Sequence, residues 1–214
     1  MNRINLKDQA SQRELALALA REQLRAAAPL DTACRAGVRY QPGGASSGCF
    51  ELLYLNRPFR VTHPDGLILQ ADTQKPPSHA LCLLILHYLS HADGYPLADR
   101  WVAFRELPDG LMYDRAFRDR VEPPLLAAFG SRQERFASAA RALGGQPLAF
   151  GDAAFAFAAL PRLPMAVIFY AGDDELPGTV SVLFDGAAGH YLPTEDLAVL
   201  GGLLVGSLLK TMPA

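Results

Sequence analysis

The sequence predicts an α+β fold in which a mostly antiparallel sheet packs with helices, in a single compact domain spanning residues 1–214. Short β-branched or aromatic runs precede and follow a central group of helical segments, without regular strand–helix alternation. No linker is long enough to separate domains, and no repeat of about 20 to 50 residues is visible. Apolar residues make up 50% of the chain and charged residues 20%, which excludes a disordered chain, a collagen and a disulfide scaffold.

Hydrophobic periodicity and terminal residues predict helices in both halves of the chain. The expected helices cover residues 7–27, 30–36, 78–91, 115–129 and 131–144, and a buried helix begins at residue 194 and includes the apolar stretch 197–209. Ser78 and Thr194 are expected to be N-cap residues, and Ser131 with Glu134 matches a capping box. Pro123-Pro124 is expected to break or kink its helix, because two amide donors are lost there.

Runs of β-branched and aromatic residues bounded by turn residues predict the strands. The expected strands cover residues 38–41, 49–55, 58–62, 67–70, 101–107, 153–159, 165–170 and 179–184. Asn56 and Arg57 are expected to form the tight reversal between the second and third strands, so that the first strands form an antiparallel meander.

Charge, apolar runs and cysteine usage predict a cytoplasmic protein that binds neither nucleic acid nor a membrane. The formal net charge is −2, so the whole molecule has no field that attracts nucleic acid or an anionic membrane. The stretch 197–209 is shorter than the roughly 20 apolar residues of a membrane-spanning helix. Cys34, Cys49 and Cys82 are an odd number without CxxC spacing, which is typical of reduced thiols.

The segment Gly44-Ala45-Ser46-Ser47-Gly48 formally matches GxSxG, the nucleophile elbow of hydrolases. The elbow needs a strand before the serine and a helix after it, whereas here a Pro-Gly-Gly turn precedes the match and a strand follows. We therefore expect a hairpin loop. Walker, GxGxxG and HExxH motifs do not occur in the sequence.

Two histidines on one expected helix are the first candidates for a site. His87 and His91 are four residues apart and share a helix face, where imidazoles hold a transition metal or serve as an axial ligand of a tetrapyrrole. Tyr88 and Trp101 are candidate walls of a pocket beside them. For both histidines a structural role is favoured over a ligand role. His87 is expected to be a core histidine, and the imidazole of His91 is expected to complement the helix dipole.

The densest polar and aromatic cluster lies in the loop from the last strand to the last helix. It contains Asp185, His190, Tyr191 and Glu195, and loops of this kind bring side chains and helix-terminal amides together. A histidine beside carboxylates is also suited to proton transfer. The structural interpretation, a helix entry after a glycine turn, carries more weight.

Arginines concentrate in the middle of the chain, where Arg105, Tyr113 and Arg120 are further candidate ligand-binding residues. Arg115 and Arg118 are three apart and suited to clamping a phosphate or a carboxylate. Interleaved acidic residues favour a solvated, ion-paired face and argue against a nucleic-acid stripe.

The chain resembles domain-of-unknown-function family 3786 from about residue 10 to residue 209. The residues that carry the resemblance are Ile85-Leu86-His87-Tyr88-Leu89 leading to Ala92-Asp93-Gly94, Phe104-Arg105-Glu106-Leu107-Pro108, Leu183-Phe184-Asp185, Tyr191-Leu192-Pro193-Thr194-Glu195-Asp196, and Tyr113, Phe117 and Arg120. The family has no established activity, so the resemblance transfers no catalytic role to any residue.

The resemblance implies a link to anaerobic bacteria and archaea, where some family members are fused to an iron–sulfur domain like that of corrinoid proteins. Three scattered cysteines do not supply the four that such a cluster needs, so no iron–sulfur cluster is expected in this chain. A cluster-linked role would require a separate iron–sulfur or corrinoid partner. The association raises the expectation of haem or a corrinoid, with His87 or His190 as the metal ligand.

Three functions follow as hypotheses. The first is a cytoplasmic ligand-binding or accessory protein, for a small molecule such as a tetrapyrrole, with Tyr88, Trp101 and Tyr191 as pocket walls and Arg105 or Arg120 meeting acidic groups of the ligand. The second is an enzyme with an acid–base site in the loop 185–196. The third is a non-catalytic interaction module that forms a homodimer. The first depends on His87 and His190 bordering one pocket.

Overall fold

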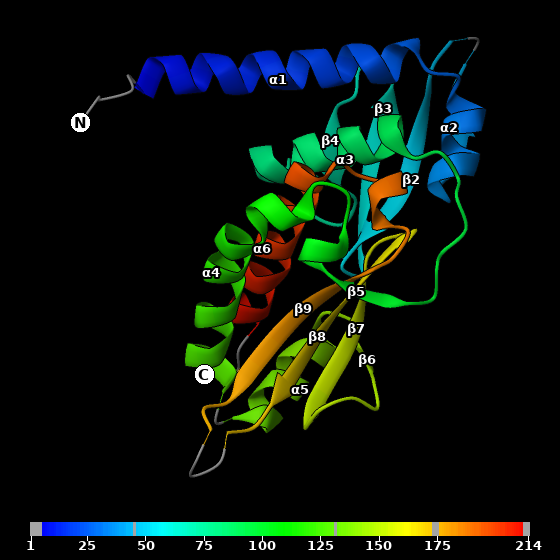
Figure 1. Ribbon diagram of the computed structural model, residues 1–214. Coiled ribbons are helices and arrows are strands. Elements are labelled where there is room, and N and C mark those ends of the chain that lie inside the picture. The colour runs from blue at the N-terminus through cyan, green and yellow to red at the C-terminus, as the bar shows by residue number, and fades with distance from the viewer. Residues whose placement is uncertain (1–5, 45, 131, 173–175, 212–214) are drawn as a thin grey trace. The chain divides into compact units, whose positions relative to one another are not determined.

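A computed structural model describes residues 6–44, 46–130, 132–172 and 176–211, with side chains described from residue 11 onwards. The helices are α1 (Leu6–Ala26), α2 (Pro29–Ala36), α3 (His79–His91), α4 (Gly110–Phe129), α5 (Gln133–Ala142) and α6 (Thr194–Lys210), with short 3₁₀ turns η1 (Phe104–Glu106) and η2 (Ala188–His190). The strands are β1 (Arg39–Pro42), β2 (Gly48–Tyr54), β3 (Arg57–His63), β4 (Ile68–Gln70), β5 (Trp101–Ala103), β6 (Gln146–Pro147), β7 (Ala153–Leu160), β8 (Leu163–Tyr170) and β9 (Thr179–Asp185). These elements form two antiparallel sheets with helices (Figure 1), which confirms the α+β class.

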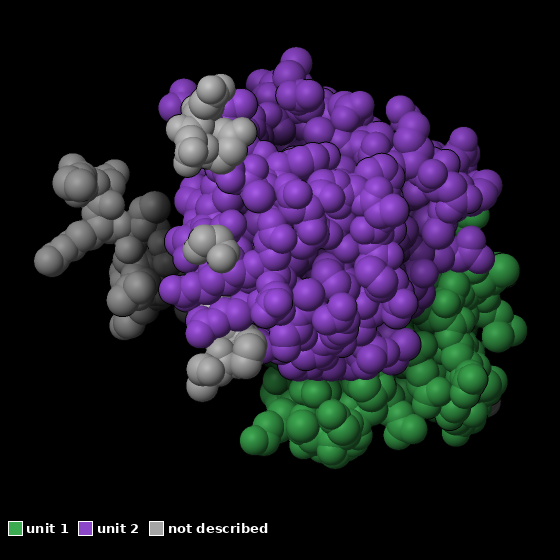
Figure 2. Space-filling view, turned by 90° about the horizontal axis from the view of Figure 1, so that it is seen from below, with its two compact units in different colours: residues 1–52, 58–94 green, residues 53–57, 95–214 purple. Residues whose placement is uncertain are grey.

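The chain divides into two compact units. Unit 1 contains residues 1–52 and 58–94, and unit 2 contains residues 53–57 and 95–214 (Figure 2). The tip of the β2–β3 hairpin therefore belongs to unit 2, while the rest of that hairpin belongs to unit 1. A single domain over the whole chain stays a prediction.

Unit 1 is built on the four-stranded sheet, in the order β1-β2-β3-β4. The side chains of Phe50, Val61 and Ile68 are buried on this sheet. The turn between β3 and β4 packs between α1 and α3, because Gly66 lies against Arg21 and Leu86. The glycine is required there, since its φ is +63° and a Cβ would lie 2.9 Å from Arg21.

The reversal between β2 and β3 lies one residue earlier than the sequence predicts. Leu55 and Asn56 are the two turn residues, with φ values of 45° and 62°. Two successive residues with positive φ form the type of turn that matches the twist of a two-residue hairpin. Asn56 adopts this conformation readily, and Leu55 adopts it because its side chain is buried, at 2% exposure.

Gly44, Ser46 and Ser47 of the GxSxG match lie in the hairpin loop that the sequence predicts. Gly48 begins strand β2 and no helix follows the serine, so the nucleophile-elbow geometry is not formed. The Tyr40 side chain lies across Gly48, and a Cβ at this position would overlap the phenol ring. The last glycine of the motif therefore has a packing role in the sheet.

Unit 2 is built on the five-stranded sheet, in the order β5-β9-β8-β7-β6. The two-residue strand β6 is not among the predicted strands. One face of the sheet is covered by helices through aromatic pairs: Phe117 of α4 packs on Phe184, and Phe136 of α5 packs on Phe155 and Phe169. Helix α6 packs on the same face, where Gly201 lies against Phe117 and Met165. Residues 196–209 of α6 are buried or half-buried, as expected.

The predicted strand over residues 101–107 is only partly correct. β5 ends at Ala103, and the next three residues form η1. The Glu106 carboxylate accepts a hydrogen bond of 2.8 Å from the Ala103 N–H, which turns the chain out of the sheet. Phe104 then stacks on Phe117 with ring centroids 4.3 Å apart. Burial of this ring favours the turn over a longer strand.

The sequence predicts a break or a kink of the central helix at Pro123-Pro124; the break is wrong, and the kink stays a prediction. α4 runs without interruption from Gly110 to Phe129 and starts five residues before the predicted position 115. The prolines cannot donate to the carbonyls of Asp119 and Arg120. The helix continues because Val121, Leu125 and Phe129 extend one buried stripe past the prolines.

The predicted helix caps have three different outcomes. Ser78 is the N-cap of α3, as predicted, and its hydroxyl accepts from the Leu81 N–H. Thr194 is not a cap: Pro193 occupies that position, and the Thr194 hydroxyl donates instead to the carbonyl of Pro108. Ser131 of the predicted capping box lies outside the described residues.

Candidate functional site

The predicted site residues are divided between the two units. His87, Tyr88 and His91 lie on α3 in unit 1. The others lie in unit 2: Trp101, Arg105, Tyr113, Arg120, Asp185, His190, Tyr191 and Glu195. The expectation that His87 and His190 border one pocket stays a prediction.

On α3, Tyr88 is a core residue of unit 1. Its side chain is fully buried, and its hydroxyl donates a hydrogen bond of 2.6 Å to the carbonyl of Ala36 at the end of α2. This bond holds α2 against α3, which is a structural role. His87 is half-buried and His91 is exposed in the last turn of the helix.

Asp185 organises the loop that precedes β5. It faces Trp101 in the β5–β9 register and is only 3% exposed. Its Oδ1 accepts hydrogen bonds of 2.9 Å from the Ala98 N–H and of 2.9 Å from the Ala187 N–H. A carboxylate oxygen that satisfies two main-chain donors fixes both chain segments.

Tyr95, which is not among the predicted site residues, belongs to the same cluster. Its ring stacks on the His190 imidazole, with centroids 3.9 Å apart and an angle of 5° between planes. The Tyr191 hydroxyl donates to the Tyr95 carbonyl, and the Tyr191 side chain is fully buried. The structure thus brings four predicted residues together: Trp101, Asp185, His190 and Tyr191. The loop before β5 connects them, and the clue to its role in the sequence is the tyrosine that follows Gly94.

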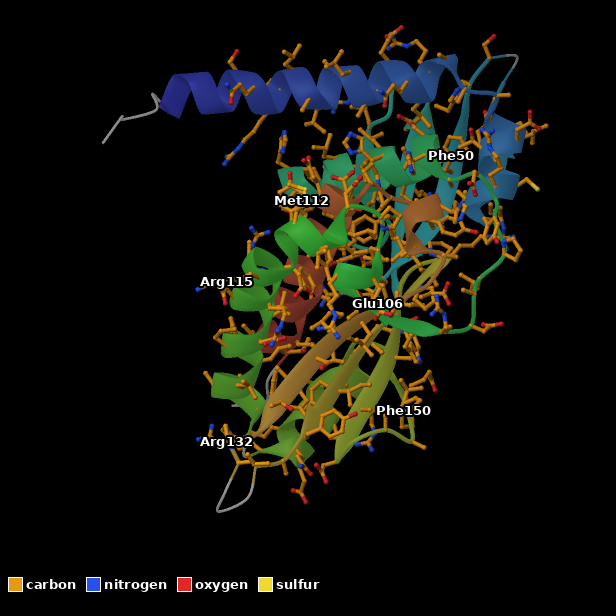
Figure 3. All side chains as sticks on the ribbon, in the orientation of Figure 1. Phe50, Glu106, Met112, Arg115, Arg132 and Phe150 are labelled. Carbon is orange, nitrogen blue, oxygen red and sulfur yellow. The ribbon has the colours of Figure 1, made fainter. Side chains whose placement is uncertain are left out.

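A cavity of about 390 Å³ opens at the first turns of α4 and α6. We call it the α4–α6 cavity, and it is lined by Pro108, Asp109, Met112, Tyr113, Gly189, Leu192, Pro193, Thr194 and Glu195. It contains two predicted residues, Tyr113 and Glu195. Met112, 84% exposed, lies in the first turns of α4 (Figure 3). The lining residues before Tyr113 are not among the predicted site residues, because the sequence pattern predicts that the helix begins only at residue 115.

The start of each helix gives the α4–α6 cavity its electrostatic character. Within the described part of the chain, no side-chain hydrogen bond caps α4 at Asp109 or α6 at Pro193. The Gly110 N–H at the start of α4 donates to the Leu107 carbonyl at 2.9 Å, so the other first-turn amides of the two helices supply partial positive charge at the cavity. The carboxylates of Asp109 and Glu195 supply negative charge.

A second cavity, of about 280 Å³, lies between α4 and the sheet. We call it the β9–α4 groove, and it is lined by Ala103, Phe104, Arg105, Asp114, Phe117, Arg118, Glu122, Leu126 and residues 179–183. Arg118 donates to Glu122 at 2.7 and 3.2 Å, as expected for an ion-paired face. Arg120 is exposed on α4 and does not line either cavity.

The cysteines and histidines form no metal centre in the described residues. No group of three or more His, Cys, Asp or Glu side chains that could hold a metal ion occurs there. The three cysteines are free, and burial raises the pKa of the Cys49 and Cys82 thiols, which keeps them protonated at neutral pH. Both ring nitrogens of His63 are buried without a hydrogen-bond partner in the described residues, and its ring packs edge-on against Tyr40 and Phe50.

The fold and these cavities define an α+β protein with two open sites of mixed polar and apolar lining on unit 2. The family model "Domain of unknown function (DUF3786)" matches residues 28–207, so the chain belongs to that family. No curated protein and no solved structure matched the chain. None of the described helices is long and apolar enough to cross a membrane.

Proposed function

We propose that this protein binds a small zwitterionic molecule, such as a free amino acid, in the α4–α6 cavity, without catalysing a reaction on it. The observation that carries the proposal is a cavity of about 390 Å³ bordered by two uncapped helix starts and two carboxylates. This volume lies at the lower end of the range for small-molecule sites.

The lining matches each part of such a ligand. First-turn amides of α4 and α6 suit a carboxylate, because helix N-termini favour negative charge. The carboxylate of Glu195, which is exposed, suits an ammonium group. The Tyr113 ring, 48% exposed, and Met112 offer apolar surface to the ligand's side chain, and a ring face also attracts a cation.

The arrangement of the loop 185–196 favours binding over acid–base chemistry. Asp185 is buried and its Oδ1 is occupied by two main-chain amides, while Glu195 lies in the α4–α6 cavity, which neither Asp185 nor His190 lines. An acid–base mechanism needs these groups within reach of one reacting atom. The enzyme hypothesis therefore has less support than binding.

Haem or corrinoid binding through His87 or His190 stays a prediction. No histidine lines the α4–α6 cavity, so the residues that form it do not supply the expected axial imidazole. The absorption spectrum of the protein with haemin or hydroxocobalamin tests the prediction, with His87→Ala and His190→Ala as comparisons. The cytoplasmic location, the anaerobic association, a separate iron–sulfur or corrinoid partner and a homodimer also stay predictions.

Thermal unfolding with each common amino acid as the probe tests the proposal. A ligand at about 100 times its Kd adds about 2.7 kcal/mol to the free energy of unfolding, which raises the melting temperature by several degrees. Glu195→Gln and Tyr113→Ala are each expected to weaken the affinity about tenfold or more, because each removes a polar or aromatic contact.

Asp119→Asn is the matched control, because Asp119 is an exposed acid on α4 that pairs with Arg115 and does not line the cavity. It is expected to bind like the wild type. The proposal is wrong when no amino acid stabilises the wild type, or when Glu195→Gln and Asp119→Asn bind equally well.

A further inference from the structure

The charged side chains that line the α4–α6 cavity are both acidic. They are Asp109, the residue before α4, and Glu195, in the first turn of α6. Both residues are exposed, and neither has an ion pair within the described residues. Among the described residues that line the cavity there is no lysine, arginine or histidine. The side chains therefore bring two negative charges to the cavity and no positive one.

The starts of α4 and α6 offset only part of this negative charge. The N-terminus of a helix carries about half of one positive elementary charge, so the two helix starts together supply at most about one. At α4 the contribution is smaller, because the Gly110 N–H already donates to the Leu107 carbonyl. The cavity thus keeps an excess of about one negative charge, and its positive and negative groups are carried by different atoms.

This excess charge distinguishes the classes of amino acid as ligands of the cavity. At neutral pH an amino acid with an uncharged side chain has no net charge, an acidic one has a charge of about −1 and a basic one about +1. Only a basic amino acid matches the excess charge of the cavity. It also keeps the carboxylate that suits the first-turn amides of α4 and α6.

The residues after Asp109 suit a long basic side chain. Met112 and Tyr113 follow Asp109 by three and four residues, which places them on the same side of the first turn of α4, and all three line the cavity. The methylene groups of a lysine or arginine side chain pack on apolar surface while the cation stays polar. The exposed thioether of Met112 and the ring of Tyr113 offer that surface, and the ring face attracts a cation.

We infer that the ligand of the α4–α6 cavity is a basic amino acid, such as lysine, ornithine or arginine. Glu195 binds its α-ammonium group, Asp109 binds the cation of its side chain, and the first-turn amides bind its carboxylate. The inference rests on the proposed function, which it narrows from zwitterionic molecules in general to one class of amino acid.

Calorimetric titration of the full-length protein with matched pairs of amino acids tests this inference. Norleucine has the carbon chain of lysine without the terminal ammonium group, and citrulline has the shape of arginine without the charge. Lysine is expected to bind about tenfold more tightly than norleucine, and arginine than citrulline, because a contact between two charged groups is stronger than a neutral one. The preference is expected to shrink in about 1 M NaCl, where the Debye length is about 3 Å.

Asp109→Asn tests the role of the first carboxylate. It is expected to weaken lysine binding about tenfold and to change norleucine binding less than about twofold, because only lysine has a side-chain cation. Asparagine keeps the shape of the side chain and readily adopts the left-handed conformation of Asp109, whose φ is 56°. Glu195→Gln is expected to weaken lysine and norleucine alike, since both have the α-ammonium group. Asp119→Asn, on the same helix but outside the cavity, is the matched control and is expected to bind lysine like the wild type.

The outcomes separate this inference from the proposed function. Equal affinities of the wild type for lysine and norleucine, or equal lysine binding by Asp109→Asn and Asp119→Asn, would overturn the inference and leave the proposed function standing. Absence of binding by every amino acid would overturn both. Cadaverine, which is lysine without its carboxylate, is expected to bind at least tenfold more weakly than lysine, because it leaves the helix amides without an anion. Equal binding of cadaverine and lysine would overturn both by showing that the cavity does not recognise the carboxylate.

Discussion

At the scale of single residues, several polar groups have structural roles that the sequence pattern alone does not reveal. Asp185 appears in the sequence as a candidate acid near His190, yet its Oδ1 accepts from two main-chain amides. Tyr88 appears as a pocket wall, yet it is a buried residue that donates to the Ala36 carbonyl. Burial and these hydrogen bonds give both residues a structural role, and a ligand contact by either stays a prediction.

The ionisation of one buried side chain, the phenol of Tyr54, makes the stability of the protein depend on pH. Burial raises its pKa from the ordinary value of 10 to about 12, opposed by a hydrogen bond with Ser207 and by the charge of Arg57. The folded state therefore keeps this phenol neutral, and its contribution to stability is full below pH 10 and lost as the pH rises from 10 to 12.

Between pH 8 and pH 11 we expect the free energy of unfolding to fall by about 1.4 kcal/mol more for the wild type than for Tyr54→Phe. At pH 11 the pH is one unit above the ordinary tyrosine pKa of 10 but still below the folded value of about 12, and one pKa unit is worth about 1.4 kcal/mol. Urea unfolding of both proteins at each pH measures the difference, and groups common to both cancel. An equal pH dependence of the two proteins would show that Tyr54 ionises normally in the folded state.

At the scale of elements, packing decides where strands and helices begin and end. The buried ring of Phe104 shortens β5 and starts η1, and the buried stripe of α4 carries the helix past Pro123 and Pro124. Local propensity correctly indicated the type of most elements, because hydrophobic periodicity depends on neighbouring residues. It failed at these boundaries, because contacts with distant residues outweigh the local preference.

The β1–β2 hairpin depends on the glycine that completes the GxSxG match. Gly48→Ala is expected to destabilise the protein by about 1 to 3 kcal/mol, because a Cβ would overlap Tyr40 and lie 2.7 Å from the Gln41 carbonyl oxygen. Denaturant unfolding measures the change. In a Tyr40→Ala background the same substitution is expected to cost less, because the overlapping ring is gone.

Gly44→Ala is the control for this hairpin, because among the described residues its Cβ would meet only the flexible Ser47 hydroxyl, at 3.2 Å. It is expected to change the stability by less than about 1 kcal/mol. Equal effects of the two substitutions would contradict a packing role for Gly48.

At the scale of the whole molecule, the units are not continuous pieces of chain. Unit 2 contains residues 53–57, the tip of the β2–β3 hairpin, whereas the rest of this hairpin belongs to unit 1. Within unit 2, Leu55 donates from its N–H to the Ala159 carbonyl at 3.3 Å, and Tyr54 bonds to Ser207. Leu55 and Tyr54 are 2% and 6% exposed, so unit 2 buries both side chains.

A fragment of residues 95–214 is therefore expected to be less stable than the full chain. It lacks the buried side chains of Tyr54 and Leu55, each of which is worth about 2 to 5 kcal/mol by analogy with large-to-small core substitutions. Thermal unfolding compares the two, and adding a fragment of residues 1–94 is expected to restore part of the loss. Equal melting temperatures would show that unit 2 folds without the hairpin tip.

By itself, the sequence determined the α+β class, most of the helices and strands and the resemblance to the family that matches residues 28–207. These depend on the pattern of neighbouring residues. Only the tertiary structure decided which side chains meet: Tyr95 stacks on His190, Thr194 bonds to Pro108, and Tyr113 shares a cavity with Glu195. Such contacts join residues about 80 to 100 positions apart, where packing and chain path set the distances and periodicity carries no information.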